Sequence, residues 1–205
     1  MSERRQHWEQ IYASKAPEGV SWYRPHLEQS LGFIDRCALP ADARIVDVGG
    51  GASTLVDDLL ARGHRNLAVI DLAAPALEAA RARLGEDGAA IDWIVGDVTT
   101  PLLEPESVDL WHDRAVFHFL VEEEARAAYL SQVLRALKPG GLCLVATFAP
   151  DGPEQCSGLP VVRYDADGLH AVFGGSFEKL GSATEQHETP WGSAQSFTYC
   201  FCRRV

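Results

Sequence analysis

The sequence has few basic residues and no long apolar run. Its 205 residues carry 18 Lys and Arg against 29 Asp and Glu, a formal charge of −11 at pH 7. A nucleic-acid binder contacts phosphates mainly through clustered Lys and Arg, so we expect no nucleic-acid partner. No apolar stretch approaches the roughly 18 residues of a membrane span, and the first residues contain no signal-peptide-like segment. We therefore expect a soluble, cytoplasmic protein with no membrane partner.

The cysteines also exclude some classes of protein. Five is an odd number, so a complete intramolecular disulfide framework would leave one thiol over. Cys200 and Cys202 form a C-x-C pair, and residues two apart in a strand share one face. A metal site would need more thiolates or histidines nearby in sequence. The cysteines are therefore expected to be structural, and no metal is predicted.

Alternating strand-like and helical patterns indicate the fold. Five short apolar runs stand at residues 44–48, 66–71, 91–95, 108–112 and 142–148. Helices are predicted within the first 40 residues and over about 53–62, 75–85, 122–137 and 165–173. Strands that alternate with helices form a parallel sheet with right-handed crossovers and helices on both faces. The last strand-like runs, 177–184 and 195–203, are separated only by a turn-rich segment and should pair antiparallel. The predicted fold class is α/β, a three-layer Rossmann-like sandwich with a seven-stranded, mostly parallel sheet and an antiparallel C-terminal strand pair.

A glycine-rich turn follows the first strand. Gly49, Gly50 and Gly51 lie between Asp47-Val48 and a helix for which Ser53 is a good N-cap. Glycine allows a tight turn and lets a ligand approach the main chain without a Cβ in the way. Free N–H groups at the helix start favour an anionic group. A purely structural turn is the alternative.

Two acidic residues at the ends of the next strands point to a nucleoside. Asp71 ends the second strand, where a carboxylate can accept from both hydroxyls of a ribose; helix capping is the alternative. Asp97 follows the third strand and is well placed to accept from an exocyclic amine. A dinucleotide fingerprint G-x-G-x-x-G would need glycine where the chain has Thr54. That substitution disfavours an NAD(P)-dependent oxidoreductase.

These motifs resemble, in their order and spacing, those of the class I S-adenosylmethionine-dependent methyltransferases. The segments are VDVGGGAS (46–53), VID (69–71), GDV (96–98), VDL (108–110) and LKPGG (137–141), within about residues 40–148. The resemblance implies the cofactor S-adenosyl-L-methionine, with S-adenosyl-L-homocysteine as product, lying across the first three strand ends. The cofactor-binding residues that it implies, with Trp22 and Tyr23 added as candidate lid residues, are Asp47, Gly49, Gly51, Ser53, Asp71, Leu72, Asp97, Val98, Asp113, Trp22 and Tyr23.

In that family, residues that touch the methyl group and the acceptor follow the fourth strand, here 111–119. The segment contains no Asn-Pro-Pro-Tyr or Asp-Pro-Pro-Tyr run, which an amino-methylating DNA enzyme would require. Asp113 and His118 are the candidate catalytic residues. His118 or His112 would suit as a base for a hydroxyl or protonated amine, and Asp113 could attract a cationic acceptor. The alternative for His118 is a core residue, and for Arg114 an ion pair rather than a carboxylate anchor.

The sequence thus predicts a methyltransferase that transfers a methyl group by in-line displacement to a small-molecule acceptor. The alternatives are a protein-lysine methyltransferase, whose start the arrangement of Trp8, Tyr12, Trp22 and Tyr23 resembles, an oxidoreductase, and a non-catalytic S-adenosylmethionine-binding protein. A single domain is predicted over 1–205. It comprises a helical cover (1–40), a cofactor-binding core (41–148) and a C-terminal helix with the strand pair (149–205). The oligomeric state is left open.

Overall fold

The computed structural model describes residues 3–205, and one sheet organises them. In spatial order its strands are β3 (Asp92–Val95), β2 (Asn66–Asp71), β1 (Arg44–Val48), β4 (Val108–Arg114), β5 (Leu137–Phe148), β9 (Ala194–Arg204) and β8 (Phe177–Glu188). The first five are parallel to one another, while β9 runs antiparallel to both β5 and β8. The predicted seven-stranded sheet with an antiparallel C-terminal pair is confirmed.

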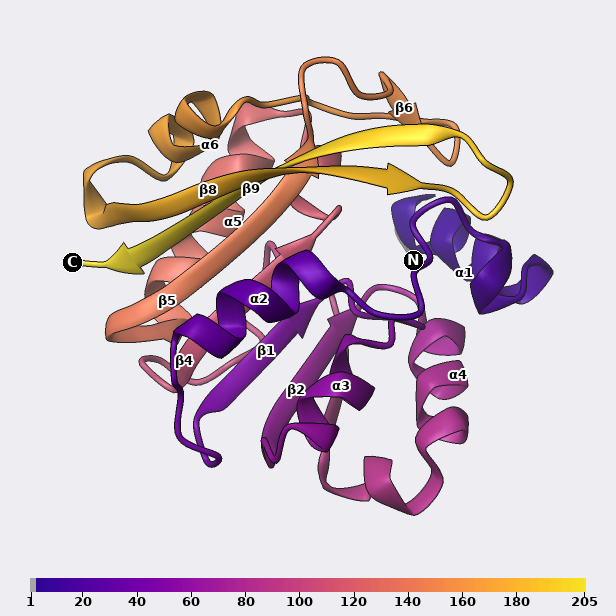
Figure 1. The fold of residues 1–205 in the computed structure, drawn as a ribbon, viewed down its shortest axis with the longest axis horizontal. Coiled ribbons are helices and arrows are strands. Elements are labelled where there is room, and N and C mark those ends of the chain that lie inside the picture. Colours follow the sequence, from indigo (N-terminus) through magenta and orange to yellow (C-terminus); the bar gives the residue numbers. More distant parts are fainter. Residues whose placement is uncertain (1–2) are drawn as a thin grey trace.

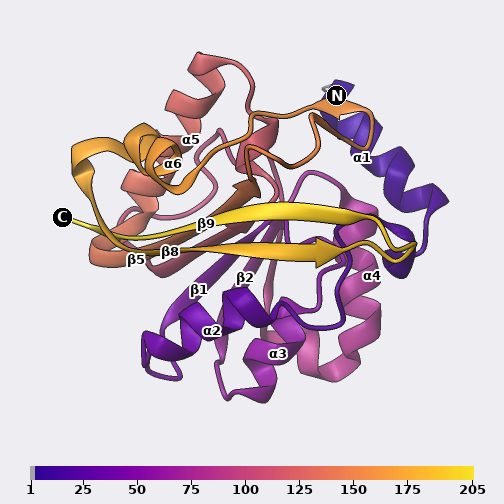
Figure 2. The same ribbon diagram turned by 45° about the horizontal axis from the view of Figure 1, so that its top comes forward.

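Helices cover both faces of this sheet. They are α1 (Glu3–Ser14), α2 (Glu28–Arg36), α3 (Leu55–Ala61), α4 (Ala74–Leu84), α5 (Glu123–Ala136) and α6 (Ala166–Phe173). Figure 2 shows α5 and α6 on one side and α2, α3 and α4 on the other, which makes three layers. The remaining helix, α1, packs against α4 at the end of the molecule toward which β1 and β2 point (Figure 1).

Burial of the parallel strands on both faces explains their composition. Ile45 of β1 packs with the apolar side chains of α2 and α3, whereas Val46 and Val48 pack in the cluster under α5 and α6. A strand covered on both sides is apolar at nearly every position rather than at alternate ones. Asp47 interrupts this run, and a buried carboxylate needs a partner. That exception marks the functional end of the strand.

Several element boundaries differ from prediction for identifiable reasons. The fifth strand begins at Leu137 rather than after Gly141, because Leu137 already pairs with Val108 before the register shifts. The predicted N-cap Ser53 precedes the helix by two residues: α3 begins at Leu55, and Thr54 occupies the N-cap position. Strand β4 continues to Arg114 instead of ending at residue 112, which brings that side chain to the strand end.

The structure also bears on the predictions about membrane spans, metal sites and cysteines. No helix in this range is long and apolar enough to cross a bilayer. No group of three His, Cys, Asp or Glu side chains in the same range is arranged to hold a metal ion. Cys200 and Cys202 are buried within the core cluster that α5 and α6 cover, as expected of structural cysteines.

Candidate functional site

A cleft opens beyond the carboxyl ends of β1, β2 and β4, with an empty volume of about 780 Å³ including its mouth. In open parallel sheets this edge is where ligands bind. The predicted residues on its walls are Trp22, Gly49, Asp71, Leu72, Asp97 and Val98. A second space of about 490 Å³ shares some of these walls and is lined by the predicted residues Tyr23, Asp47 and Ser53. The structure therefore gathers nearly the whole predicted set around two adjoining spaces.

The glycine turn needs its glycines. Gly49 has φ +65°, and a Cβ there would collide with the Cγ2 methyl of Val116. Gly51 has φ +37°, and its Cβ would lie 2.7 Å from Asp71 Oδ2 and 3.1 Å from the hydroxyl of Tyr12. Positive φ and close approach both favour glycine over any other residue. The turn therefore requires glycine at both positions.

A buried hydrogen-bond chain supports this turn from behind. Asp47 Oδ1 lies 2.7 Å from Nδ1 of His112, whose Nε2 lies 2.9 Å from the hydroxyl oxygen of Ser30. All three side chains are buried. Both ring nitrogens of His112 are thus bonded within the protein. His112 orients Asp47 and has no nitrogen left to take a proton from an acceptor.

The two acidic residues at the strand ends differ in environment. Asp71 is buried, and its Oδ1 accepts the N–H of Ala73 at 2.8 Å. Burial raises the pKa of Asp71 to about 7; the bond from Ala73 opposes this rise, and the charge of Asp47 adds to it. Asp97 Oδ1 accepts from the N–H and the hydroxyl of Thr99 at 2.9 and 2.7 Å. Asp71 also resembles a helix cap, but its other oxygen packs beside Gly51 and the residue lines the cleft.

Aromatic side chains form the outer wall of the cleft. Trp8 of α1 packs edge-on against Trp22 and against Phe119, with ring centroids 5.7 and 5.1 Å apart. Tyr12 lies one helical turn further along α1, 6.3 Å from Trp22. All four rings line the cleft, together with the thiol-bearing Cys156 of the short strand β6 (Gln155–Cys156). Of these residues, only Trp22 was predicted from the sequence to be a cofactor-binding residue.

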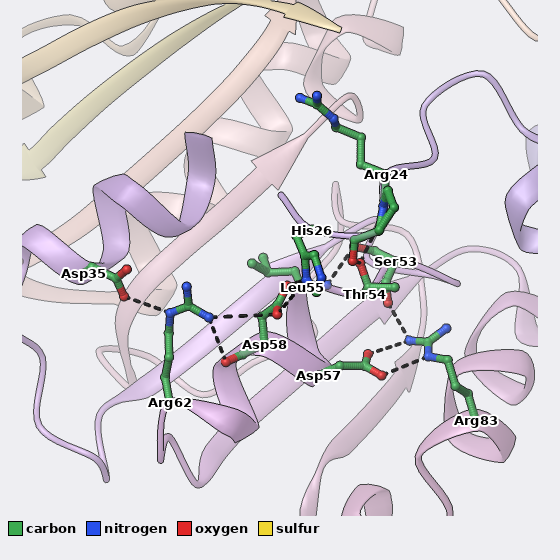
Figure 3. Close-up of polar contacts among 11 residues, drawn as sticks. Arg24, His26, Asp35, Ser53, Thr54, Leu55, Asp57, Asp58, Arg62 and Arg83 are labelled. Carbon is green, nitrogen blue, oxygen red and sulfur yellow. Dashed lines mark hydrogen bonds and ion pairs between the residues drawn. The ribbon is translucent and has the colours of Figure 1, made fainter. Parts of the chain in front are cut away.

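Polar contacts fasten the chain around residues 24–26 to α3 (Figure 3). The hydroxyl of Thr54 donates to the carbonyl oxygens of Arg24 and Pro25 at 3.1 and 2.9 Å. His26 Nδ1 lies 2.9 Å from a carboxylate oxygen of Asp58. The side chain of Arg24 itself points away from α3 (Figure 3). Residue 54, where a dinucleotide fingerprint would require glycine, thus anchors the segment that carries Trp22 and Tyr23.

The comparisons with known proteins agree with this geometry. A family model described as a methyltransferase domain matches residues 45–141, from β1 into β5. Residues 45–141 therefore form a domain of the S-adenosylmethionine-dependent methyltransferase type.

Named relatives of this methyltransferase differ in what they act on. A ubiquinone/menaquinone biosynthesis C-methyltransferase of Ruegeria sp. is 31% identical over 57% of this chain and 47% of its own. An EEF1A lysine methyltransferase 2 of Danio rerio is 24% identical over 67% of this chain and 62% of its own. The chain therefore spans between about half and two thirds of these relatives. A SAM-dependent methyltransferase structure from Anabaena variabilis shares the fold, with TM-score 0.72 and 17% identity over 100% of this chain and 96% of the other.

The residues present fit the family's cofactor. Gly49, which carries no side chain, lines both spaces, and the buried carboxylate of Asp71 can accept from hydroxyls. Asp97 and Val98 lie at the other end of the same cleft wall, after β3. The individual contacts stay predictions, because they depend on the bound cofactor.

The two candidate catalytic residues lie in the core instead of on the cleft wall. Asp113 accepts from the N–H groups of Val116 and Phe117 and, at 2.7 Å, from the hydroxyl of Tyr129; burial raises its pKa to about 6. His118 is fully buried, and burial lowers its pKa to about 3. Among the described residues 3–205, neither Asp113 nor His118 lines the cleft or the adjoining space. The core alternative for His118 therefore fits the structure better than the catalytic one.

Arg114 takes the place that Asp113 was expected to occupy. It is the last residue of β4 and lines both spaces. Side chains alternate across a strand, so Arg114 points to the opposite face from Asp113.

Trp191 is 60% exposed in the turn between β8 and β9 and lines neither space.

Proposed function

We propose that this methyltransferase transfers a methyl group by in-line displacement to a small-molecule acceptor bound against the aromatic wall. The observation that carries this proposal is the cover over the acceptor side of the cleft. Trp8 and Tyr12 of α1, Trp22 and the β6 residue Cys156 stand on its outer walls.

The cofactor contacts that we propose follow the walls of the cleft. Gly49 and Gly51 receive the methionine part, with Asp47 behind the turn supporting the amino group. Asp71 accepts from the ribose hydroxyls. The adenine lies against Leu72 and Val98, with Asp97 as the acceptor for its exocyclic amine. Trp22, Tyr23 and Ser53 close the methionine end.

Bound S-adenosylmethionine supplies the electrophile, a methyl group on a sulfonium. The protein must then hold the acceptor atom about 3–3.5 Å from the methyl carbon, in line with the sulfur. The aromatic wall orients the acceptor and excludes water. Asp113 contributes by fixing the turn at 116–117, which places Val116 against the glycine turn.

An acceptor that needs no protein base fits this site best. His112 has both nitrogens bonded, and the buried His118 has a pKa of about 3. Burial raises the pKa of Tyr12 well above 10, so its hydroxyl is a poor base as well as a poor acid near neutral pH. A neutral amine, a thiolate or a stabilised carbon nucleophile reacts without further activation, which favours these acceptor atoms.

The protein-lysine alternative has one feature in its favour and one against it. Some relatives are named lysine methyltransferases, including the Danio rerio protein. Against it, Arg114 lines the cleft beside the aromatic wall, and its positive charge repels a lysine ammonium there. The carboxylates of Asp71 and Asp97 lie at the strand ends that we propose for the cofactor.

Calorimetric titration with S-adenosylhomocysteine, with NAD and NADP as parallel controls, tests cofactor use. We expect one-site binding of S-adenosylhomocysteine alone, weakened in an Asp97→Ala variant whose melting temperature is unchanged. Binding of NAD instead would overturn the proposal.

A methyl-labelled cofactor then tests the acceptor class. The enzyme is incubated with the two halves of an ultrafiltered bacterial extract. Label in the low-molecular-weight half supports a small-molecule acceptor. Label confined to protein would replace that proposal with the lysine alternative, and label in neither half would favour a non-catalytic binding protein.

A further inference from the structure

We propose that the acceptor is a flat, apolar molecule carrying a single carboxylate, and that Arg114 binds this carboxylate. The inference rests on the proposed small-molecule function and narrows it to a substrate class. A buried excess of positive charge beside the aromatic wall supports it.

Arg114 is held rigidly yet incompletely bonded. Its Nε donates to the hydroxyl of Tyr199 at 3.1 Å, and its Nη1 donates to the carbonyl oxygen of Trp22 at 3.2 Å. One face of the guanidinium covers the ring of Phe197, 4.2 Å from its centroid. Nη2 is buried and makes no hydrogen bond within residues 3–205. A donor group of this kind, with only 5% of the side chain exposed, is costly to leave unpaired.

The only carboxylate near Arg114 among the described residues is already shared. Glu185 of β8 is bonded by Arg24 and by the hydroxyl of Tyr199 at 2.6 Å. Its Oε2 lies 3.6 Å from Nη2 of Arg114, too far for a hydrogen bond. One carboxylate thus faces two guanidinium groups.

The neighbouring titratable groups do not restore the balance. Burial opposes ionisation of Glu185, but Arg114, Tyr199 and Arg24 outweigh it and hold its pKa below the usual range. Burial lowers the pKa of His187, which also packs here, so that imidazole is neutral near pH 7. One unit of positive charge is therefore left over in the group of Arg24, Glu185 and Arg114, of which Arg114 lines the cleft. The carboxylates of Asp71 and Asp97 on the same cleft lie at the strand ends that we propose for the cofactor. A monoanion matches that surplus, whereas a phosphate dianion would exceed it.

The aromatic wall adds the second half of the substrate description. Arg114 lines the same cleft as Trp8, Trp22 and Phe119, whose rings stand edge to face. Such rings favour a flat apolar body, and by themselves they would also favour a cation. The guanidinium decides between these options, because a cationic acceptor would meet Arg114 directly. A planar carboxylate also pairs well with the flat edge of an arginine.

The methionine part of the cofactor also carries a carboxylate, which Arg114 could bind in place of one on the acceptor. Arg114 lines the methionine-end space as well as the cleft, so the experiment must separate the two sources. Occupying the cofactor site first achieves this. In the saturated enzyme, only a carboxylate from the acceptor can respond to a change at Arg114.

The test uses three matched probes in the presence of saturating S-adenosylhomocysteine, followed by calorimetry. Naphthoate, naphthamide and naphthylmethylamine share one flat body and differ in charge. We expect naphthoate to bind at least about tenfold more tightly than naphthamide, and the amine not to bind.

Four variants locate the effect. Arg114→Met alone would leave Glu185 uncompensated and could unfold the chain, so the charge-balanced double variant Arg114→Met/Glu185→Gln is measured beside it. We expect the double variant to lose the preference for naphthoate over naphthamide while its affinity for S-adenosylhomocysteine stays within about twofold. Trp8→Ala weakens naphthoate and naphthamide by the same factor. Trp191→Ala, on the exposed turn, changes neither.

The contrary results are distinct from one another. A weaker affinity for S-adenosylhomocysteine with an unchanged probe preference would assign Arg114 to the cofactor and overturn the inference. Equal binding of naphthoate and naphthamide would overturn the inference but leave a small-molecule acceptor standing. Tightest binding of the amine would also overturn the inference, because Arg114 would then not select a carboxylate, and it would leave a small-molecule acceptor standing. Failure of all three probes to bind would overturn the flat-acceptor assignment.

Discussion

The affinity for S-adenosylhomocysteine should depend on pH through Asp71. Burial raises the pKa of this carboxyl to about 7 in the free protein. Ribose hydroxyls donate to the ionised form, so binding lowers the pKa and expels a proton wherever the free protein still holds one. The affinity is therefore flat above about pH 7 and falls as the pH decreases below it.

The size of the effect follows from the difference between the two pKa values. If the pKa of the carboxyl in the complex returns to its ordinary value of about 4, each pH unit below 7 costs about 1.4 kcal/mol of binding free energy. The free carboxyl is already half protonated at pH 7, so between pH 7 and pH 5 the affinity then falls by about 50-fold. The stability of the free protein depends on pH in the opposite direction to the affinity. A raised folded pKa favours the protonated native state, so this group's contribution to stability decreases from about pH 4 to about pH 7.

Calorimetry from pH 5 to pH 8, in two buffers of different ionisation enthalpy, measures both the affinity and the protons released. The Asp71→Asn variant is the control and should bind more weakly with no pH dependence. Tyr12 faces Asp71, but its raised pKa keeps it protonated throughout this range. A flat wild-type profile would refute the reasoning. A slope that persists in Asp71→Asn would show that a group other than Asp71 releases the proton.

Three further changes have defined outcomes. Gly49→Ala should destabilise the fold by about 1–3 kcal/mol and weaken S-adenosylhomocysteine binding at least tenfold, because its Cβ meets Val116; Gly19→Ala, where a Cβ meets nothing within 4 Å, should do neither. Thr54→Val should lower the free energy of unfolding in urea by about 1 kcal/mol, since it releases two backbone carbonyls. Asp113→Ala should cost about 2–4 kcal/mol of stability, because three buried donors lose their acceptor.

Each of these results has a counterpart that would contradict it. Equal effects of the two alanine variants would mean that the glycine turn tolerates a side chain. An unchanged urea midpoint for Thr54→Val would show that the segment at 24–26 is held by other contacts. For Asp113, an unchanged melting temperature with lost cofactor affinity would return it to the cofactor-binding set.

The sheet and the cofactor half of the site were predictable because their signals are local. Parallel strands bring their carboxyl ends to one edge, so residues that end successive strands must meet there. Gly49, Asp71 and Asp97 each end or follow a strand with a clear apolar pattern. Boundaries were less predictable at 53–55, because the contacts of Thr54 come from residues 24 and 25.

The acceptor half was not predictable to the same degree. Asp113 and Arg114 are adjacent charged residues, and in Phe117-His118-Phe119 a polar residue stands between two apolar ones. In both segments the sequence leaves open which side chain faces the cleft. The turn at 117–119, held by Asp113, turns His118 into the core and Phe119 onto the wall. No sequence pattern indicates which way such a turn closes.

The sequence by itself determined the three-layer sandwich and the edge of the sheet at which we propose that the cofactor binds, because hydrophobic period and glycine geometry act over a few neighbouring residues. Only the tertiary structure decided which charges meet. Arg114 and Glu185 lie on strands separated by β5 and β9 in the sheet, and Arg24 reaches the same carboxylate from a segment far back in the chain. An uncompensated buried charge is a property of the closed fold, since water solvates each of these groups separately until the strands and the N-terminal segment come together.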